Sequence, residues 1–126
     1  MLPLLKRKAR VLILDDDLAM QRLIAKLLSR QGYRVDVVSA AAPAIEKIAQ
    51  TDYAVLLLDL MTPTEGGMTV IRHLKQSKPA MLSRVLLVTA SPDAVLRAVA
   101  PDVAGVVQKP FEAPELIAAV ERVAAQ

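Results

Sequence analysis

The chain contains no cysteine among its 126 residues, which excludes disulfide bonds and metal sites built on thiolates. Aromatic residues account for only 2% of the sequence, so it offers no platform on which the bases of a single nucleic-acid strand could stack. Its apolar runs, such as residues 54–58, are far too short to cross a bilayer. Hydrophobic residues nevertheless make up 54% of the chain, which is enough for one core without covalent staples. We therefore expect one cytoplasmic domain over residues 1–126.

The net charge of +3 is concentrated near the N-terminus, where Lys6, Arg7, Lys8 and Arg10 lie close together. Such a patch is compatible with nucleic-acid binding. It is more typical of a solvated segment that leads into a first strand, and we favour that interpretation. We expect a basic lead-in over residues 1–9, a folded core over residues 10–126, and no direct contact with nucleic acid or membrane.

Hydrophobic periodicity predicts strands and helices in alternation. Residues 11–14, 54–58 and 85–88 are apolar at every position, which is typical of strands buried on both faces of a parallel sheet. Residues 34–38 and 105–107 are two further strand candidates. Apolar residues at helical spacing predict five helices, over residues 18–31, over 41–50, through Val70, Ile71 and Leu74, from Ser91 onward, and over 113–125. This alternation predicts an α/β fold with helices on both faces of a parallel sheet.

Two helix ends carry specific signals. Gly32 follows the helix predicted at 18–31 and suits a C-cap with positive φ. The sequence Ser91-Pro92-Asp93 predicts a helix start, with Ser91 as N-cap and Pro92 at the first helical position.

Polar side chains follow four of the predicted strands at the point where each strand ends. They are Asp15, Asp16 and Asp17 after the first, Asp59 after the third, Thr89 after the fourth and Lys109 after the fifth. Ligands of open parallel sheets bind beyond the carboxyl ends of the strands, so these side chains are expected to meet. Carboxylates placed close together need a counter-charge, which a hard divalent cation and Lys109 would supply.

Each of these residues also has a purely structural interpretation. The aspartate triplet could form a loop with Asp17 capping the next helix, and Asp59 could cap or turn. Thr89 is an ordinary strand residue, and Lys109 could be a solvated surface charge. Their joint placement at one edge favours a single site instead. A carboxylate there can act as a nucleophile and become an aspartyl phosphate, with a metal and a lysine around the phosphoryl oxygens.

At this point the sequence resembles the receiver domain of two-component response regulators, from about Ala9 to about Ala125. The resemblance is carried by Val11-Leu12-Ile13-Leu14-Asp15-Asp16-Asp17, by Leu56-Leu57-Leu58-Asp59-Leu60-Met61-Thr62-Pro63, by Gly67, by Leu87-Val88-Thr89-Ala90, and by Lys109-Pro110-Phe111. It implies a flavodoxin-like, doubly wound, five-stranded parallel sheet in the order 2-1-3-4-5, with five helices on its two faces.

The resemblance also implies a role for each residue. Asp59 would accept the phosphoryl group. Asp15, Asp16 and Asp59 would hold Mg²⁺, together with the backbone carbonyl of Met61. Asp17 would then be a helix cap and not a metal ligand.

The remaining site residues would contact the phosphoryl group itself. Thr89 would bind a phosphoryl oxygen and move on activation, and Ala90 would leave the group room. Lys109 would pair with its oxygens, and the Lys109–Pro110 peptide bond would be cis. The implied partners are a histidine kinase or histidine phosphotransfer protein, and downstream a protein partner or a detached output domain. A homodimer is a further option, and the domain would be a regulator instead of a metabolic enzyme.

Three departures from the family pattern concern how the signal is read. Val106 stands where the family usually has Tyr or Phe, so the aromatic half of the usual switch is missing. The stretch from Thr89 to Lys109 is shorter than usual and contains Pro101. Gly66 stands where Asp is frequent, which we expect to alter loop flexibility only.

Two other functions remain open. The run Leu12–Asp17 also resembles the start of haloacid-dehalogenase-like phosphatases, with Asp15 as nucleophile, but that interpretation leaves Asp59 without a role. A receiver-like module that binds a partner without phosphorylation is the other alternative, suggested by Val106. A phosphorelay role for His73 is disfavoured, because a lone histidine on a helix is more often a surface side chain.

Overall fold

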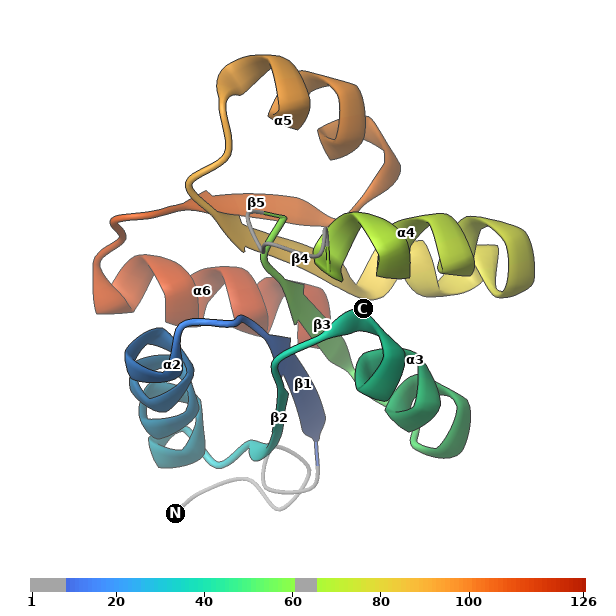
Figure 1. The fold of residues 1–126 in the computed structure, drawn as a ribbon. Helices are drawn as coiled ribbons and strands as arrows, with labels where there is room; N and C mark the ends of the chain where they lie inside the picture. The colour runs from blue at the N-terminus through green and yellow to red at the C-terminus, as the bar shows by residue number, and fades with distance from the viewer. Residues whose placement is uncertain (1–8, 61–65) are drawn as a thin grey trace.

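A computed structural model, which describes residues 9–60 and 66–126, contains one parallel sheet of five strands in the order β2-β1-β3-β4-β5. The strands are β1 (Arg10–Leu14), β2 (Arg34–Val38), β3 (Val55–Leu58), β4 (Val85–Thr89) and β5 (Gly105–Gln108). The predicted fold class and strand order are confirmed. Figure 1 shows the sheet in the middle of the molecule with helices on both of its sides.

Five α-helices lie within the described residues: α2 (Leu18–Arg30), α3 (Ala41–Gln50), α4 (Gly66–Ser77), α5 (Asp93–Val99) and α6 (Ala113–Ala124). Two short 3₁₀ helices, η1 (Pro79–Arg84) and η2 (Ala100–Asp102), precede β4 and β5. Of the described helices, none is both long and apolar enough to pass through a membrane.

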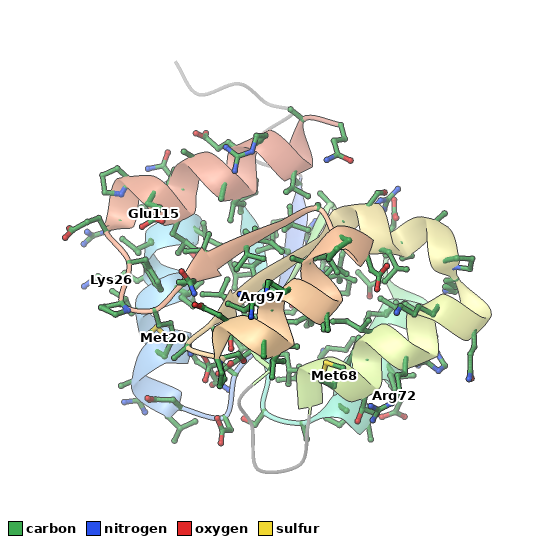
Figure 2. All side chains as sticks on the ribbon, turned by 90° about the horizontal axis from the view of Figure 1, so that it is seen from above. Met20, Lys26, Met68, Arg72, Arg97 and Glu115 are labelled. Carbon is green, nitrogen blue, oxygen red and sulfur yellow. The ribbon has the colours of Figure 1, made fainter. Side chains whose placement is uncertain are left out.

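The sheet separates two hydrophobic cores, one on each of its faces. Leu12 and Leu56 face a core closed by α3, α4 and α5, whereas Ile13 and Leu57 face a core closed by α2 and α6. Figure 2 shows Met20 on α2 and Met68 on α4 on opposite sides of the sheet, each packed against a different core. Continuous apolar runs were the correct signal for these strands, because alternate side chains enter different cores.

The two ends of α2 are fixed by its sequence. At its start, the Asp17 side chain accepts hydrogen bonds from the backbone N–H groups of Ala19 at 2.9 Å and Met20 at 3.2 Å, so the capping role of Asp17 is confirmed. At its end, Gln31 is the C-cap and Gly32 follows it with φ 96° and donates to the Ser29 carbonyl, so the positive φ predicted for Gly32 is confirmed one position beyond the cap.

The predicted start of α5 is wrong by one residue and in its cap. Pro92 is the N-cap, the helix begins at Asp93, and no side chain caps it. The Ser91 side chain is buried and its hydroxyl lies 2.9 Å from the Thr89 hydroxyl. The Ser91 hydroxyl therefore bonds to the buried Thr89 hydroxyl and does not cap α5.

Candidate functional site

Backbone pairing brings the strand ends into register at one edge of the sheet. The Asp15 N–H donates to the Val38 carbonyl at 3.2 Å, and the Asp59 N–H donates to the Leu14 carbonyl at 3.1 Å. The Lys109 N–H extends the last ladder by donating to the Thr89 carbonyl at 3.0 Å. The polar residues predicted at four strand ends are thereby held side by side.

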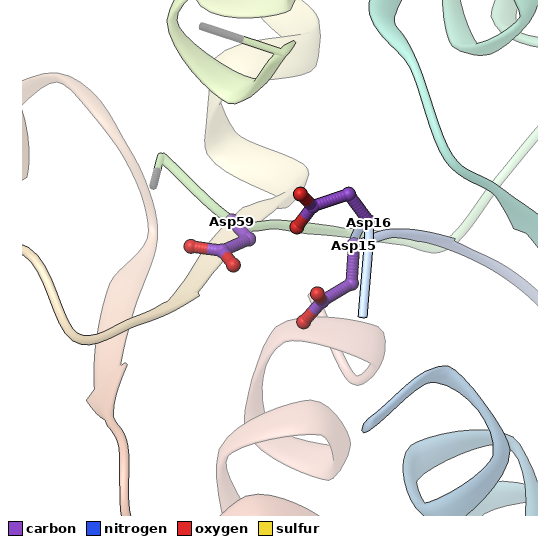
Figure 3. Close-up of side chains that lie close together, drawn as sticks. All are labelled: Asp15, Asp16 and Asp59. Atoms are coloured by element: carbon purple, nitrogen blue, oxygen red, sulfur yellow. The ribbon is translucent and has the colours of Figure 1, made fainter. Parts of the chain in front are cut away.

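Three carboxylates form the acidic part of the site. Asp15, Asp16 and Asp59 each offer an oxygen, and these oxygens lie within 4.8 Å of one another (Figure 3). Asp15 and Asp59 are 2% and 5% exposed, whereas Asp16 is open to solvent. Oxygen ligands only, two of them on a rigid buried edge and one at the rim, are the donor set that suits a hard divalent cation.

The ammonium group of Lys109 supplies the positive charge that the site itself carries. Its Nζ atom lies 2.6 Å from Asp15 Oδ2 and 3.0 Å from Asp59 Oδ2. Burial lowers the pKa of Lys109, but the hydrogen bonds to Asp15 and Asp59 outweigh this effect and the net pKa is raised. Lys109 is therefore held in its charged form between Asp15 at the end of β1 and Asp59 at the end of β3.

The other oxygen of the Asp59 carboxylate is bound by a hydroxyl group. Thr89 Oγ1 donates to Asp59 Oδ1 at 2.7 Å, and Thr89 is completely buried. Ala90 follows it directly and is exposed, so the chain ends the strand with a side chain no larger than a methyl group. Lys109 and Thr89 thus donate hydrogen bonds to different oxygens of the Asp59 carboxylate.

Gln21 is a residue of this region that the sequence interpretation missed. It is buried, and its Nε2 atom donates to the Asp15 carbonyl and lies 3.2 Å from the Val38 carbonyl and 2.9 Å from Ser39 Oγ. The amide thereby joins the ends of β1 and β2 to α2. Its position at a buried site of the amphipathic helix pattern was the only available signal, and that signal does not name the partners.

Gly67 lets α4 approach the backbone of Asp59. Its N–H donates to the Asp59 carbonyl at 3.2 Å. A Cβ atom on Gly67 would lie 2.5 Å from that carbonyl oxygen and 2.9 Å from its carbon, which is closer than atoms can approach without displacement. Glycine is therefore required here by contact with the main chain.

Other residues named from the sequence lie as follows. Met61, proposed as a carbonyl ligand, is outside the described residues. The Lys109–Pro110 bond is cis, as the resemblance implied. His73 lies on α4 and is not one of the three residues that form the acidic cluster.

Val106 borders a hollow on the surface between α5, β5 and α6. This hollow has a volume of about 330 Å³ and is lined by Leu96, Arg97, Ala100, Val106, Gln108 and Glu115. Figure 2 shows Arg97 on α5 and Glu115 on α6 at this part of the molecule. In the part of the chain that the structure describes, the small side chain of Val106 thus borders open space.

Comparison with known proteins gives one family. The model of the response regulator receiver domain matches residues 11–121. The transcriptional regulatory protein CutR of Streptomyces coelicolor is 36% identical over 113 residues, covering 88% of this chain and 51% of CutR. The response regulator ArlR of Staphylococcus saprophyticus is 28% identical, covering 88% of this chain and 50% of ArlR. The chain spans about half the length of these curated relatives.

Solved structures agree with the fold. A sensor protein from Polaromonas sp. JS666 superimposes with a TM-score of 0.83 at 30% identity, covering 94% of this chain and 97% of that one. The receiver domain of the sensor histidine kinase PA1611 from Pseudomonas aeruginosa superimposes with a TM-score of 0.83 at 22% identity, covering 94% and 98%. That structure has a magnesium ion coordinated in its active-site cleft.

Proposed function

Because the chain belongs to the response regulator receiver domain family, we propose that it accepts a phosphoryl group on Asp59 from a phosphohistidine of a partner protein. Receiver domains interact with histidine kinases and output domains, and they bind Mg²⁺ at an acidic pocket. The observation that carries the proposal for this chain is the environment of Asp59. One of its oxygens accepts from Thr89 and the other pairs with Lys109, at the sheet edge that also bears Asp15 and Asp16.

The metal would be held by Asp15, Asp16 and Asp59, with the Met61 carbonyl as a further ligand. The three described carboxylates fit it because they are oxygen donors close enough to share one ion. Bound Mg²⁺ supplies charge neutralisation for the oxygens of the phosphoryl group.

In the proposed transfer, a carboxylate oxygen of Asp59 attacks phosphorus in line. The new bond joins Asp59 to phosphorus, the bond from phosphorus to the histidine nitrogen breaks, and the imidazole leaves with the electron pair. Lys109 and Thr89 stabilise charge on the phosphoryl oxygens, since both already point at the Asp59 carboxylate. Ala90 leaves space for the group.

Phosphorylation would then bias the surface toward a state that a partner binds better. The partner would be a separate protein or an output domain, and a homodimer is one form this can take. We place the reaction in the cytoplasm, and we regard the domain as a regulator that assists its own phosphorylation and slow hydrolysis.

The proposal is tested by incubating the protein with Mg²⁺ and acetyl phosphate and measuring its intact mass. One added phosphoryl group that requires Mg²⁺ and disappears in Asp59→Asn is the expected result. The matched control is Asp52→Asn, which alters an exposed aspartate paired with Arg84 and should leave labelling unchanged. Label that survives in Asp59→Asn but is lost in Asp15→Asn would instead favour the phosphatase-like function.

A second candidate is a module that binds its partner without phosphorylation. The hollow beside Val106 favours it, because the surface there lacks the side chain that usually couples to Thr89. No label on a folded wild-type protein would be the result that selects this function.

A further inference from the structure

We propose that Ser91 is a positioning residue, which donates a hydrogen bond to the Thr89 hydroxyl and so directs the Thr89 proton to the Asp59 carboxylate. The inference rests on the proposed function of Asp59, and it adds a residue that neither the family pattern nor the strand-end argument singled out. Ser91 is 4% exposed and Thr89 is fully buried, so water does not compete for these hydroxyl groups.

Counting protons fixes the direction of the chain of hydrogen bonds. A threonine hydroxyl has one proton, and a carboxylate paired with a lysine only accepts. The 2.7 Å contact between Thr89 Oγ1 and Asp59 Oδ1 therefore uses the proton of Thr89. In the 2.9 Å contact between Thr89 and Ser91, the oxygen of Thr89 must accept and the hydroxyl of Ser91 must donate.

The helix that follows does not explain the placement of Ser91. The N-cap of α5 is Pro92, and no side chain caps its first turn. A serine that served only to start the helix would turn its hydroxyl toward the free N–H groups of that turn. Ser91 turns instead toward Thr89, so its hydroxyl belongs to the site and not to the helix.

The arrangement has two effects on Thr89. A donor behind the hydroxyl holds its oxygen in one position, so the proton does not have to reorient when charge develops in front of it. In a buried environment, accepting a hydrogen bond also polarises the hydroxyl and strengthens the bond that it donates. Loss of Ser91 Oγ should weaken the contribution of Thr89 to phosphoryl transfer and leave the charges of the site intact.

The kinetic test compares Ser91→Ala with wild type in the rate of phosphorylation by acetyl phosphate at saturating Mg²⁺. We expect a decrease on the order of three- to tenfold, the worth of one hydrogen bond. Ser91→Thr retains a hydroxyl and should restore the rate. Ser83→Ala is the matched control, because its hydroxyl bonds to the Ala80 carbonyl on η1, away from the site.

A double-mutant cycle separates positioning from a general structural effect. In Thr89→Val there is no hydroxyl to position, so adding Ser91→Ala should change the rate by less than about twofold. A slowing that persists in the Thr89→Val background would overturn the proposal, and so would a wild-type rate in Ser91→Ala alone.

A second readout does not depend on phosphorylation. Three-bond NMR couplings of the Thr89 side chain should report one χ1 rotamer in the unphosphorylated wild type and averaged rotamers in Ser91→Ala. Identical couplings in the two proteins would overturn the role of Ser91. If the wild type takes no label, the proposed function of Asp59 fails, and the couplings still decide whether Ser91 positions Thr89.

Discussion

The Nζ atom of Lys109 lies 2.6 Å from Oδ2 of Asp15, although 94 positions separate the two residues in the chain. The same ammonium group also contacts Asp59, so one lysine offsets two carboxylates that are almost completely buried. Lys109 therefore reduces the repulsion between the carboxylates of Asp15 and Asp59.

Replacing Lys109 by glutamine should destabilise the metal-free protein by about 3 kcal/mol, because buried carboxylates lose their counter-charge. Added Mg²⁺ should recover part of the loss. The measurement is urea unfolding in EDTA and in Mg²⁺. Lys75→Gln is the control, since Lys75 pairs with Asp102 where both side chains are well exposed, and it should cost about 1 kcal/mol or less. Equal losses in the two variants would contradict this interpretation of the site.

Gly67→Ala should disturb both stability and the site, because the added Cβ would collide with the main chain of Asp59. We expect a loss of roughly 2 kcal/mol or more and a slower phosphorylation of Asp59. Gly105→Ala is the matched change, since its Cβ would meet only Leu86 Cδ1 at 3.4 Å. The prediction fails if thermal unfolding and labelling rate are the same for both alanine variants.

Gln21→Ala should lower the free energy of unfolding by about 1–3 kcal/mol, because the carbonyls of Asp15 and Val38 lose a buried donor. It should also weaken Mg²⁺ binding, since the loop that carries Asp15 loses its attachment to α2. Titration calorimetry with Mg²⁺ and chemical unfolding measure the two effects. Gln76→Ala, on the exposed face of α4, should change neither. Unaltered Mg²⁺ affinity in Gln21→Ala would show that the Gln21 contacts stabilise the fold and do not affect the metal site.

Tyr53 should titrate late at alkaline pH. Burial and the 2.6 Å hydrogen bond that its hydroxyl donates to Asp36 together raise its pKa to about 12. Because this pKa lies above the ordinary value near 10, Tyr53 contributes stability in full below pH 10 and loses it as the pH rises to about 12. Tyrosinate absorbance in Tyr33→Phe, which leaves Tyr53 as the only tyrosine, measures this directly. A midpoint near 10 in protein that circular dichroism shows to be folded would contradict the prediction.

The sequence was sufficient for the sheet and for most of the site because both depend on short, local patterns. Runs such as residues 55–58 are apolar throughout, and a polar residue directly after a parallel strand has only one edge at which to lie. The same rule predicts that Asp59, Thr89 and Lys109 lie together at that edge.

Contacts that depend on side-chain direction could not be read in this way. Ser91-Pro92-Asp93 satisfies the local rule for a helix start, but that rule takes no account of the Thr89 hydroxyl, which lies within hydrogen-bond distance of the serine. Gln21 occupies an ordinary buried position of an amphipathic helix, and the three oxygens around its amide nitrogen come from other segments. The helices η1 and η2 are too short to show a hydrophobic periodicity, so the sequence pattern does not predict them.

Phosphorylation of Asp59 is tested most sharply by identifying the residue that carries the phosphoryl group. The protein is phosphorylated with acetyl phosphate and Mg²⁺, the acyl phosphate is reduced with borohydride to the corresponding alcohol, and the peptides are sequenced by mass spectrometry. We expect homoserine at position 59 and unmodified aspartate at positions 15 and 16. Homoserine at position 15, with Asp59 unchanged, would contradict it.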